Sequence, residues 1–310
     1  MDEIRSPVTG GSTSLVDRFC AHSLIALYRD MLSVDVAPVF AGLDHIDLRR
    51  CDATGYEFFH PLTVAGGPEF YHALYSQEAH KRWAYKENRW EFDAVCALDG
   101  PFEAVLDVGA GDGRLLARLA GKADRAIGLE TNPYGLANAR EKGLTLHSED
   151  VEGHAARNPQ SYDLVTAMQV LEHVGAVREF VAACVAALKP GGRLVIAVPD
   201  NDGFVGLQRD LPLNLPPHHV GRWRRESLRA LARHFDLELL AIDHEPLGED
   251  ILGWYRSVME DRYLPQGRMV RGLYRRLGGA KVFQRFLSEQ RHTIHGHTVM
   301  ATYRRPQAAA

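Results

Sequence analysis

The stretch VLDVGAGDG, residues 105–113, decides the fold of this chain. An apolar run that predicts a buried strand ends in three glycines, each separated by one residue, and the helical stretch RLLARLAG follows at once. Glycine adopts the left-handed backbone conformations that such a turn needs, and it lets a ligand come close to the main chain. In a doubly wound sheet this turn lies at the carboxyl end of the first strand, where ligands bind. The stretch therefore predicts a ligand site between a strand and a helix.

Strand-like and helical segments alternate after this turn. The further strand-like runs are residues 125–131, 144–150, 162–170, 193–200, 237–246 and 297–305. Between the first two of these runs, Asn132 has the side chain of a helix N-cap, Pro133 suits a first helical turn, and Gly143 suits a helix end. Alternating strands and helices produce a parallel sheet covered on both faces. The sequence predicts an α/β fold with a doubly wound, Rossmann-like sheet of seven strands, the last pair antiparallel.

The rest of the chain is expected to surround this sheet. Residues 1–98 are rich in aromatic side chains and contain helical patterns, such as the apolar spacing of residues 14–31, which predict a mostly helical N-terminal cap. Residues 99–310 would form the ligand-binding domain. Two segments, at about 203–225 and 247–295, interrupt the strand pattern, and connections of that length usually have a function or a structure of their own. We expect both insertions to cover the ligand site together with the cap.

Composition excludes several classes of protein. The 310 residues carry a formal net charge of −4, from 36 basic and 40 acidic side chains, so no positive field calls for a nucleic-acid partner. The four cysteines are scattered without a CxxC pair, which argues against a disulfide framework or a zinc knuckle. The N-terminus lacks the pattern of a signal peptide, and no apolar run reaches the ~18 residues of a membrane span. These features predict a cytoplasmic protein with reduced thiols.

The glycine pattern distinguishes between cofactors. A dinucleotide-binding GxGxxG motif would need glycine at Arg114, and a phosphate-binding loop would end in GK[ST], which the sequence lacks. Instead, GxGxG follows the acidic strand residue Asp107, and this resembles the class I S-adenosylmethionine-dependent methyltransferases. The aromatic-rich N-terminal segment together with PPHHVGRW, residues 216–223, resembles members of that family that act on small molecules in glycan or natural-product assembly. The resemblance implies S-adenosylmethionine as cofactor. It implies cofactor contacts from Asp107, Gly109, Ala110, Gly111, Gly113, Glu130, Thr131, Asp150, Val151 and Gln169.

Within this resemblance, several strand ends carry residues with expected roles. Glu130 ends the second strand, where family members place a carboxylate on both ribose hydroxyls. Asp150 ends the third strand, where an acid lies near the adenine amino group, with the N–H of Val151 on the ring. Asp107 either reaches the methionine amino group or only braces the glycine loop. Residues 169–173, at the end of the fourth strand, are expected to line the methionine and the reacting centre.

The end of the fourth strand also limits the choice of acceptor. Methyltransferases of nucleobase amines or of a glutamine amide carry an Asn/Asp-Pro-Pro-aromatic motif there, whereas this sequence has QVLEHV, residues 169–174. The stretch LKPGGRLVIAVP, residues 188–199, resembles the turn and fifth strand of small-molecule methyltransferases. We therefore expect a small-molecule acceptor and no nucleic acid.

Candidates for catalysis come from NLPPHHVGRW, residues 214–223, which follows the fifth strand and should lie above the reaction site. Histidine titrates near neutrality, and a general base typically accelerates a reaction by about 10²–10⁴. His218 and His219 are the first candidates, and His173 is a rival. Because neighbouring residues of an extended segment point to opposite sides, only one of the pair should face the substrate. Metal binding or simple packing of the rings remains an alternative.

We interpret the chain as an S-adenosylmethionine-dependent methyltransferase (EC 2.1.1) that methylates oxygen on a small hydroxylated acceptor, a saccharide or a secondary metabolite, with a histidine as general base. Transfer to nitrogen or carbon, and a non-catalytic partner protein with this fold, are the alternatives. No metal ion is expected, although Asp200, Asp202 and Glu172 offer the oxygen ligands of a metal-dependent variant.

The second insertion contains one further pattern. Between Arg268 and Leu287 it carries six basic residues, no acidic residue, and apolar residues interleaved with the basic ones. The usual reason for such a pattern is that the apolar side chains pack on the protein while the arginines face water. The Gly278-Gly279 pair also interrupts any continuous apolar face. We expect a cover over the active site or a contact in a homodimer, and we expect no membrane contact.

Overall fold

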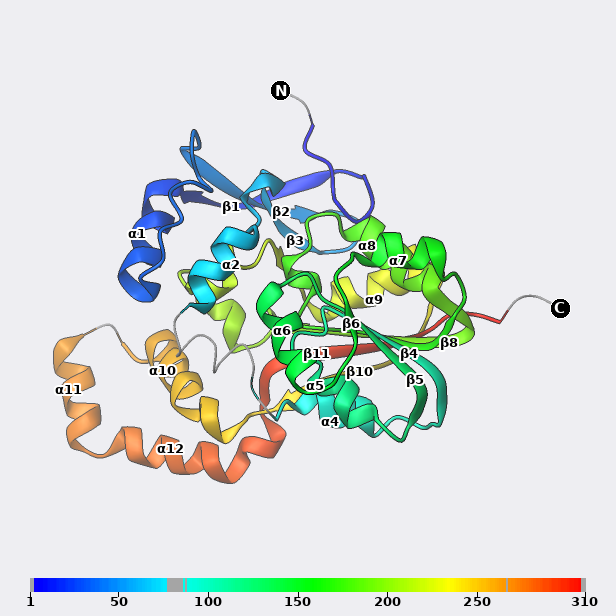
Figure 1. The fold of residues 1–310 in the computed structure, drawn as a ribbon. Coiled ribbons are helices and arrows are strands. Elements are labelled where there is room, and N and C mark those ends of the chain that lie inside the picture. Colours follow the sequence, from blue (N-terminus) through cyan, green and yellow to red (C-terminus); the bar gives the residue numbers. More distant parts are fainter. Residues whose placement is uncertain (1–2, 77–85, 87, 266, 308–310) are drawn as a thin grey trace.

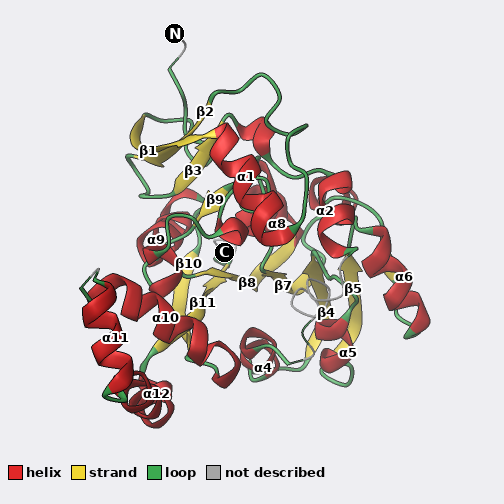
Figure 2. Ribbon diagram, turned by 90° about the vertical axis from the view of Figure 1, so that its left-hand side faces the viewer, coloured by secondary structure: helices red, strands yellow, loops and turns green. Residues whose placement is uncertain are grey.

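The computed structural model describes residues 3–76, 86, 88–265 and 267–307, and it contains two sheets (Figures 1 and 2). The strands of the larger sheet are, in spatial order, β10 (Glu238–Pro246), β11 (His295–Arg304), β8 (Leu188–Pro199), β7 (Tyr162–Met168), β4 (Phe102–Val108), β5 (Ala123–Leu129) and β6 (Leu146–His147). The pairs from β8 to β6 are parallel, whereas β11 is antiparallel to both β8 and β10. The order reverses next to β4, the first strand of the sheet. The prediction of a doubly wound, seven-stranded Rossmann-like sheet is confirmed.

Helices cover both faces of this sheet because its strands are apolar on both sides. Leu106 of β4 joins a core with α7 (Val151–Arg157), α8 (Val177–Ala187) and α9 (Arg225–His234). Its neighbour Val105 belongs to the opposite core, with α4 (Trp90–Cys96) and α5 (Arg114–Leu119). Successive strand residues point to opposite faces, so one strand serves two cores. Helix α4, which the sequence placed in the cap, therefore packs on the sheet. Helix α6 (Pro133–Glu141) completes the unit that follows β5.

The N-terminal region contains an antiparallel sheet that the sequence did not predict. Its strands are β1 (Thr13–Cys20), β2 (His45–Cys51) and β3 (Glu57–His60), and its helices are α1 (Ala21–Leu32) and α2 (Pro68–Tyr75). The prediction of a helix over residues 14–31 is wrong for its first half, because residues 13–20 pair along their length with β2. Long-range pairing has overridden a local helical pattern here. Part of the aromatic-rich segment, residues 83–85 and 87, lies outside the described residues.

The first insertion joins the N-terminal region. Its short strand β9 (Gly221–Arg222) pairs with β3 and so becomes the fourth strand of the smaller sheet. The hydroxyl of Tyr28, on α1, donates hydrogen bonds to the carbonyls of Pro212 (2.6 Å) and Leu215 (2.8 Å). Residues 203–225 and the N-terminal region therefore form one layer, which lies beside the carboxyl ends of the larger sheet.

The second insertion is helical, as the sequence predicts. It forms α10 (Leu252–Tyr263), α11 (Arg268–Arg276) and α12 (Gly279–Gln290) between the antiparallel strands β10 and β11. Figure 1 shows α11 and α12 at the periphery of the molecule, away from the smaller sheet. Among the described residues, no helix has the length and apolar character that crossing a membrane requires.

Candidate active site

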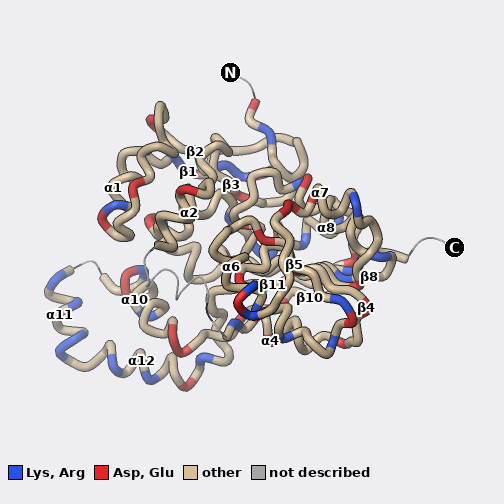
Figure 3. The backbone as a smooth tube through the Cα atoms, in the orientation of Figure 1, with Lys and Arg blue, Asp and Glu red and all other residues tan. Residues whose placement is uncertain are grey.

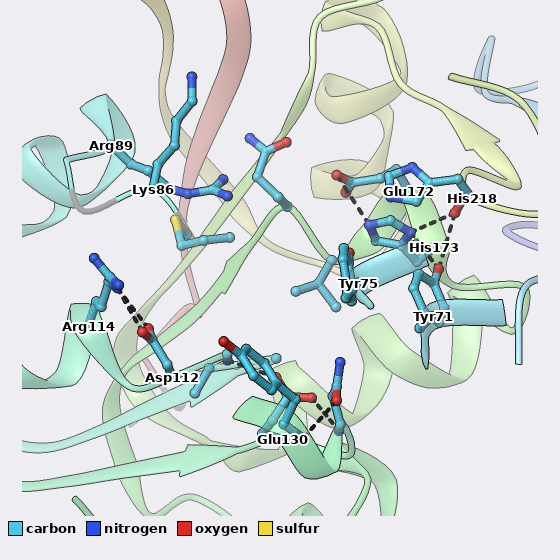
Figure 4. Close-up of a pocket in the computed structure, with 18 of the residues that line it drawn as sticks. Tyr71, Tyr75, Lys86, Arg89, Asp112, Arg114, Glu130, Glu172, His173 and His218 are labelled. Carbon is cyan, nitrogen blue, oxygen red and sulfur yellow. Dashed lines mark hydrogen bonds and ion pairs between the residues drawn. The ribbon is translucent and has the colours of Figure 1, made fainter. Parts of the chain in front are cut away.

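A cavity of about 950 Å³ lies at the carboxyl ends of the parallel strands. The glycine loop after β4, the end of β5, the segment after β7, helix α2 and both insertions contribute to its wall. The residues that the sequence assigned to the cofactor and that line this cavity are Asp107, Gly109, Ala110, Gly111, Glu130, Thr131 and Gln169. Figure 4 shows the acidic cofactor candidate Glu130 and the catalytic candidate His173 on the same cavity.

The glycine loop has the backbone that the sequence predicts. Gly109, Gly111 and Gly113 have φ values of +70°, +58° and +77°, a region that residues with a side chain rarely occupy. A Cβ atom at Gly109 would lie 2.4 Å from a methyl carbon of Val170. The loop must therefore be glycine both for its conformation and for its contact with the segment after β7.

Glu130 holds the glycine loop from the end of β5. Its carboxylate accepts hydrogen bonds from the N–H of Gly111 (2.7 Å) and the N–H of Asn132 (2.6 Å). Burial raises the pKa of Glu130, and the backbone N–H groups oppose that shift. The carboxylate lies on the cavity wall next to the loop, where it is available to ligand hydroxyl groups.

Asp107 is a buried carboxyl group on the floor of the cavity. The hydroxyl of Thr166, on β7, donates a hydrogen bond of 2.6 Å to it. Burial raises the pKa of Asp107 to about 7, against the lowering effect of the Thr166 hydrogen bond and with a further increase from the charge of Glu130. Its charge therefore changes near neutral pH, and a cationic ligand group would favour the ionised form.

Gly113, Asp150 and Val151 do not line the cavity. Gly113 is the N-cap residue of α5. Asp150 is the N-cap of α7, and its carboxylate accepts a hydrogen bond of 2.7 Å from the N–H of Gly153. The expected contact of Asp150 with an adenine amino group stays a prediction, and it would have to use the carboxylate that also caps α7.

Two charged residues of the loop were missed by the sequence reasoning. Asp112 and Arg114 line the cavity, and Arg114 donates a hydrogen bond of 2.8 Å to Asp112 (Figure 4). Lys142, on the neighbouring helical unit, also pairs with Asp112. Asp112 lies inside the GxGxG stretch, so its position in the motif was the signal that could have identified it.

The three candidate histidines form one cluster on the cavity wall. The rings of His218 and His219 are stacked, with centroids 4.4 Å apart and planes at 26°. The ring of His173 lies edge-on to both, at 4.8 Å from each. All three side chains line the cavity. The expectation that His218 and His219 point to opposite sides is wrong, because residues 216–218 form a turn rather than an extended strand.

The environment of His173 selects one tautomer of its ring. Nδ1 lies 2.7 Å from the carbonyl oxygen of His218, which accepts a hydrogen bond, so Nδ1 carries the proton and Nε2 has the lone pair. The Tyr71 hydroxyl also donates to this carbonyl, at 3.2 Å. Nε2 lies 3.9 Å from the carboxyl group of Glu172 (Figure 4). The ring is therefore held in the neutral form that accepts a proton at Nε2.

Burial sets the charge of this cluster. It lowers the pKa of His173 to about 4 and raises the pKa of the neighbouring Glu172 to about 8. Burial also lowers the pKa of His219, and the adjacent imidazoles add to that effect. At neutral pH both histidine rings and the Glu172 carboxyl group are therefore uncharged. His173 keeps 24% of its side-chain exposure, whereas His218 is almost completely buried.

The oxygen ligands considered for a metal-dependent variant do not come together. Glu172 lines the cavity, but Asp200 and Asp202 do not. Asp200 is bonded to His244 at 3.1 Å, and Asp202 accepts a hydrogen bond of 3.0 Å from the N–H of Arg225 at the start of α9. The interpretation of these three carboxylates as one metal site is therefore wrong.

Aromatic residues of the N-terminal region form a wall that the sequence reasoning did not assign to the site. Tyr71 and Tyr75, one turn apart on α2, line the cavity with stacked rings. Trp254 of α10 and Met168 of β7 add further apolar surface. The spacing of Tyr71 and Tyr75 by four residues placed them on one helix face, but only the tertiary structure shows that this face meets the cavity.

The chain is similar in sequence to known methyltransferases. Residues 80–242, just over half of the chain, match the family model of a methyltransferase domain. The ubiquinone biosynthesis O-methyltransferase of Sodalis glossinidius (strain morsitans) is 32% identical over 173 residues, which cover 53% of this chain and 68% of that protein. The enzyme of the same name from Burkholderia multivorans is 34% identical over 164 residues, 47% of this chain and 70% of that protein. A methyltransferase structure from Archaeoglobus fulgidus has 16% identity and a TM-score of 0.46, and covers 65% of this chain and 86% of that one.

The residues on the cavity wall also fit the cofactor of that family. Among the described residues that line the cavity, eight carry carboxyl groups and three are lysine or arginine, which suits a cofactor that carries a sulfonium and an ammonium group. Gly109 and Gly111 line the cavity with their backbone, and the carboxyl groups of Asp107 and Glu130 lie on the same wall. By its sequence matches, its sheet order and this site, the chain belongs to the class I S-adenosylmethionine-dependent methyltransferase family.

Proposed function

We propose that this methyltransferase transfers the methyl group to a hydroxyl oxygen of a small acceptor, with His173 as the general base. The observation that carries the proposal is the neutral His173 ring on the wall of this cavity. Its Nδ1 is fixed by the His218 carbonyl, and its Nε2 lies 3.9 Å from the Glu172 carboxyl group. The relatives from Sodalis and Burkholderia are named O-methyltransferases, which supports transfer to oxygen.

The cofactor side of the cavity has three proposed contacts. S-adenosylmethionine supplies the electrophilic methyl group. Glu130 binds the ribose hydroxyls, because its carboxylate lies beside the loop and keeps free lone pairs after accepting two N–H bonds. Asp107 binds the methionine ammonium group. Gln169, with φ of +57° at the end of β7, lines the methionine side of the cavity.

On the acceptor side, His173 removes the hydroxyl proton as the oxygen–carbon bond forms, while the sulfur–methyl bond of the cofactor would break and leave S-adenosylhomocysteine. Its lowered pKa keeps the ring in the base form at neutral pH. An imidazolium formed there would lie 3.9 Å from the Glu172 carboxyl group, whose ionisation would balance the new charge. The Tyr71 hydroxyl and the His218 carbonyl act as positioning groups, because they fix the orientation of the His173 ring. The mechanism is mainly one of positioning, with proton transfer added.

The walls around His173 favour an acceptor with a flat apolar ring over a saccharide. Tyr71, Tyr75, Trp254 and Met168 provide surfaces that match an aromatic ring. The relatives' names place them in ubiquinone biosynthesis, which supports a phenolic hydroxyl as the group that is methylated.

The test is incubation with S-adenosylmethionine labelled in its methyl group and with paired acceptors: a phenol, the matching aniline and a saccharide. We expect label in an aryl methyl ether, located by NMR. Label on nitrogen or carbon, or on the saccharide alone, would contradict the proposal that a phenolic hydroxyl is methylated. If the protein binds the cofactor in calorimetry but labels none of a broad acceptor panel, the non-catalytic alternative gains support.

The role of Asp107 predicts a pH dependence of cofactor binding. Its pKa is raised to about 7, so the carboxyl group is neutral below that pH and attracts an ammonium group only above it. The dissociation constant of S-adenosylmethionine should therefore rise by about tenfold per pH unit as the pH falls from about 7 to about 5. Calorimetry across this range checks it. Asp107→Asn should bind weakly with a flat profile, and a wild-type profile that stays flat would leave Asp107 only the role of bracing the loop.

A further inference from the structure

Helices α11 and α12 form a hairpin whose outer face is apolar and exposed. Seven of the thirteen exposed large apolar residues found in the described part of the chain lie between residues 263 and 286. They are Tyr263 (71% exposed), Met269 (88%), Val270 (45%), Leu273 (58%), Leu277 (75%), Val282 (70%) and Phe286 (53%). Helix α11 has no buried residue, and α12 has only Leu287. The expectation that these apolar side chains pack on the protein is therefore wrong.

The inner face of the hairpin accounts for its attachment. Leu287 packs with Leu247 and Leu252 in a small core below α10. Tyr274 donates a hydrogen bond of 3.1 Å to Glu260 of α10, and its ring contacts the backbone of α12 where a Cβ atom at Gly279 would clash. The hairpin thus contacts the rest of the protein through its inner face, and its outer apolar face is not needed for that contact.

Basic side chains surround the exposed apolar residues. Arg268, Arg271, Arg275, Arg276, Lys281 and Arg285 lie in a segment without acidic residues, and Figure 3 shows this charge along both helices. Arg271 pairs with Asp261 and Arg285 pairs with Glu289. The other four form no ion pair with any described residue. Met269, Leu273 and Leu277 follow one another at four-residue intervals, so they share one side of α11.

We propose that this hairpin is a peripheral membrane-binding surface that recognises anionic lipids. An apolar helix face flanked by arginine and lysine is the combination that inserts at the boundary between headgroups and acyl chains. Anionic headgroups supply the negative charge that the hairpin lacks. This reverses the expectation from the sequence alone, which had placed the apolar residues inside, and it does not depend on the proposed acceptor.

A second copy of the chain is the main competing occupant, and charge argues against it. A symmetric dimer places the same patch of both copies in contact. Two hairpins facing each other would bring their unpaired arginines together, with no acidic residue between 268 and 287 to neutralise them. An anionic lipid surface has the complementary charge at every position of the patch.

Helix α10 connects the hairpin to the cavity, and this connection suggests what membrane binding would do. Ile251 and Trp254, at the start of α10, line the cavity, and α10 leads directly into the hairpin. Helix α10 also packs against α12 through the core around Leu252 and Leu287. A protein held on a bilayer by the hairpin would keep this wall of the cavity close to the lipid surface, from which an apolar acceptor could enter.

The experiment is sedimentation of the full chain with vesicles of phosphatidylcholine, with and without phosphatidylglycerol, at about 0.15 M salt, where charge interactions are screened beyond about 8 Å. We expect binding only to the vesicles with phosphatidylglycerol. Met269→Ser/Leu273→Ser/Leu277→Ser and, separately, Arg268→Gln/Arg275→Gln/Arg276→Gln should each lower the partition coefficient by more than about tenfold. Both variants change only exposed side chains, so their melting temperatures should match the wild type.

Matched controls come from exposed residues elsewhere on the chain. Leu15→Ser/Val16→Ser/Met31→Ser and Arg140→Gln/Arg229→Gln/Arg233→Gln should leave vesicle binding unchanged. Light scattering without lipid measures the oligomeric state. The proposal fails if the wild type stays in the supernatant with anionic vesicles, if the hairpin variants bind as well as the controls, or if the wild type is a dimer that the Met269 triple variant dissociates. Methyl transfer to a water-soluble acceptor is measured separately, so a failure here leaves the catalytic proposal intact.

Discussion

We expect Glu130→Ala to raise the dissociation constant of S-adenosylmethionine by about a hundredfold or more. The substitution removes a carboxylate that would make two charge-assisted hydrogen bonds to the ribose, and each such bond contributes about 1.5–3 kcal/mol. It also frees the N–H groups of Gly111 and Asn132, which the carboxylate holds at 2.7 Å and 2.6 Å, so the glycine loop loses its order. Calorimetric titration with the cofactor measures the effect.

Asp150→Ala is the matched control for this prediction. Asp150 also ends a parallel strand, but its carboxylate caps α7 and does not line the cavity. Its loss should destabilise the fold by about 1 kcal/mol, as for other N-caps, and leave cofactor affinity within about threefold of the wild type. If Glu130→Ala binds normally, the ribose contact is misassigned. If Asp150→Ala binds as weakly as Glu130→Ala, the adenine role that the resemblance implied is restored.

The second large effect is expected at His173. His173→Ala should lower kcat by about 10²–10⁴ while the cofactor dissociation constant stays nearly unchanged, because we propose that the imidazole acts on the acceptor and not on the cofactor. Single-turnover kinetics with saturating cofactor measures the chemical step. A general base should also permit partial rescue of His173→Gly by added imidazole, which a purely structural histidine would not show.

His72→Ala provides the control for a histidine on the same cavity. His72 lines the cavity from α2 but is exposed and lies outside the cluster, so its removal should change kcat by less than about threefold. Equal losses in His72→Ala and His173→Ala would mean that the acceptor wall, not the base, is being disturbed. Normal turnover of His173→Ala, with a loss in His218→Ala or His219→Ala, would move the role of base to the stacked pair.

The larger sheet could be predicted from the sequence because each of its strands is indicated by a short local pattern of residues. Each parallel strand is a short apolar run next to turn residues, and the order of such runs fixes the topology within narrow limits. Asp107, Gly109 and Glu130 could be placed together on one cavity wall for the same reason, since they occupy strand ends that must share one edge of the sheet. Asp150 follows the same rule but does not line the cavity, and its carboxylate caps a helix, which the strand pattern alone does not indicate.

Features that depend on distant pairing could not be predicted. Residues 13–20 carry a pattern compatible with a helix and become a strand only because β2 pairs with them. The stacking of His218 and His219 depends on a turn that no extended-chain rule describes. The apolar face of α11 has the pattern of a buried helix, and the pattern contains no information about what, if anything, covers it.

The pairing of β9 with β3 limits how this enzyme could be recombined with its relatives. Phe58 of β3 pairs with Gly221 of β9, and the carbonyl that orients His173 belongs to His218, on the same segment as β9. The N-terminal strands and the histidine cluster are thus coupled in the structure, although most of the larger sheet separates them in sequence. We expect a chimaera that exchanges the N-terminal region alone to mismatch the ladder at β9 and to shift His173. An exchange designed to alter acceptor choice would have to include residues 203–225 with the N-terminal region.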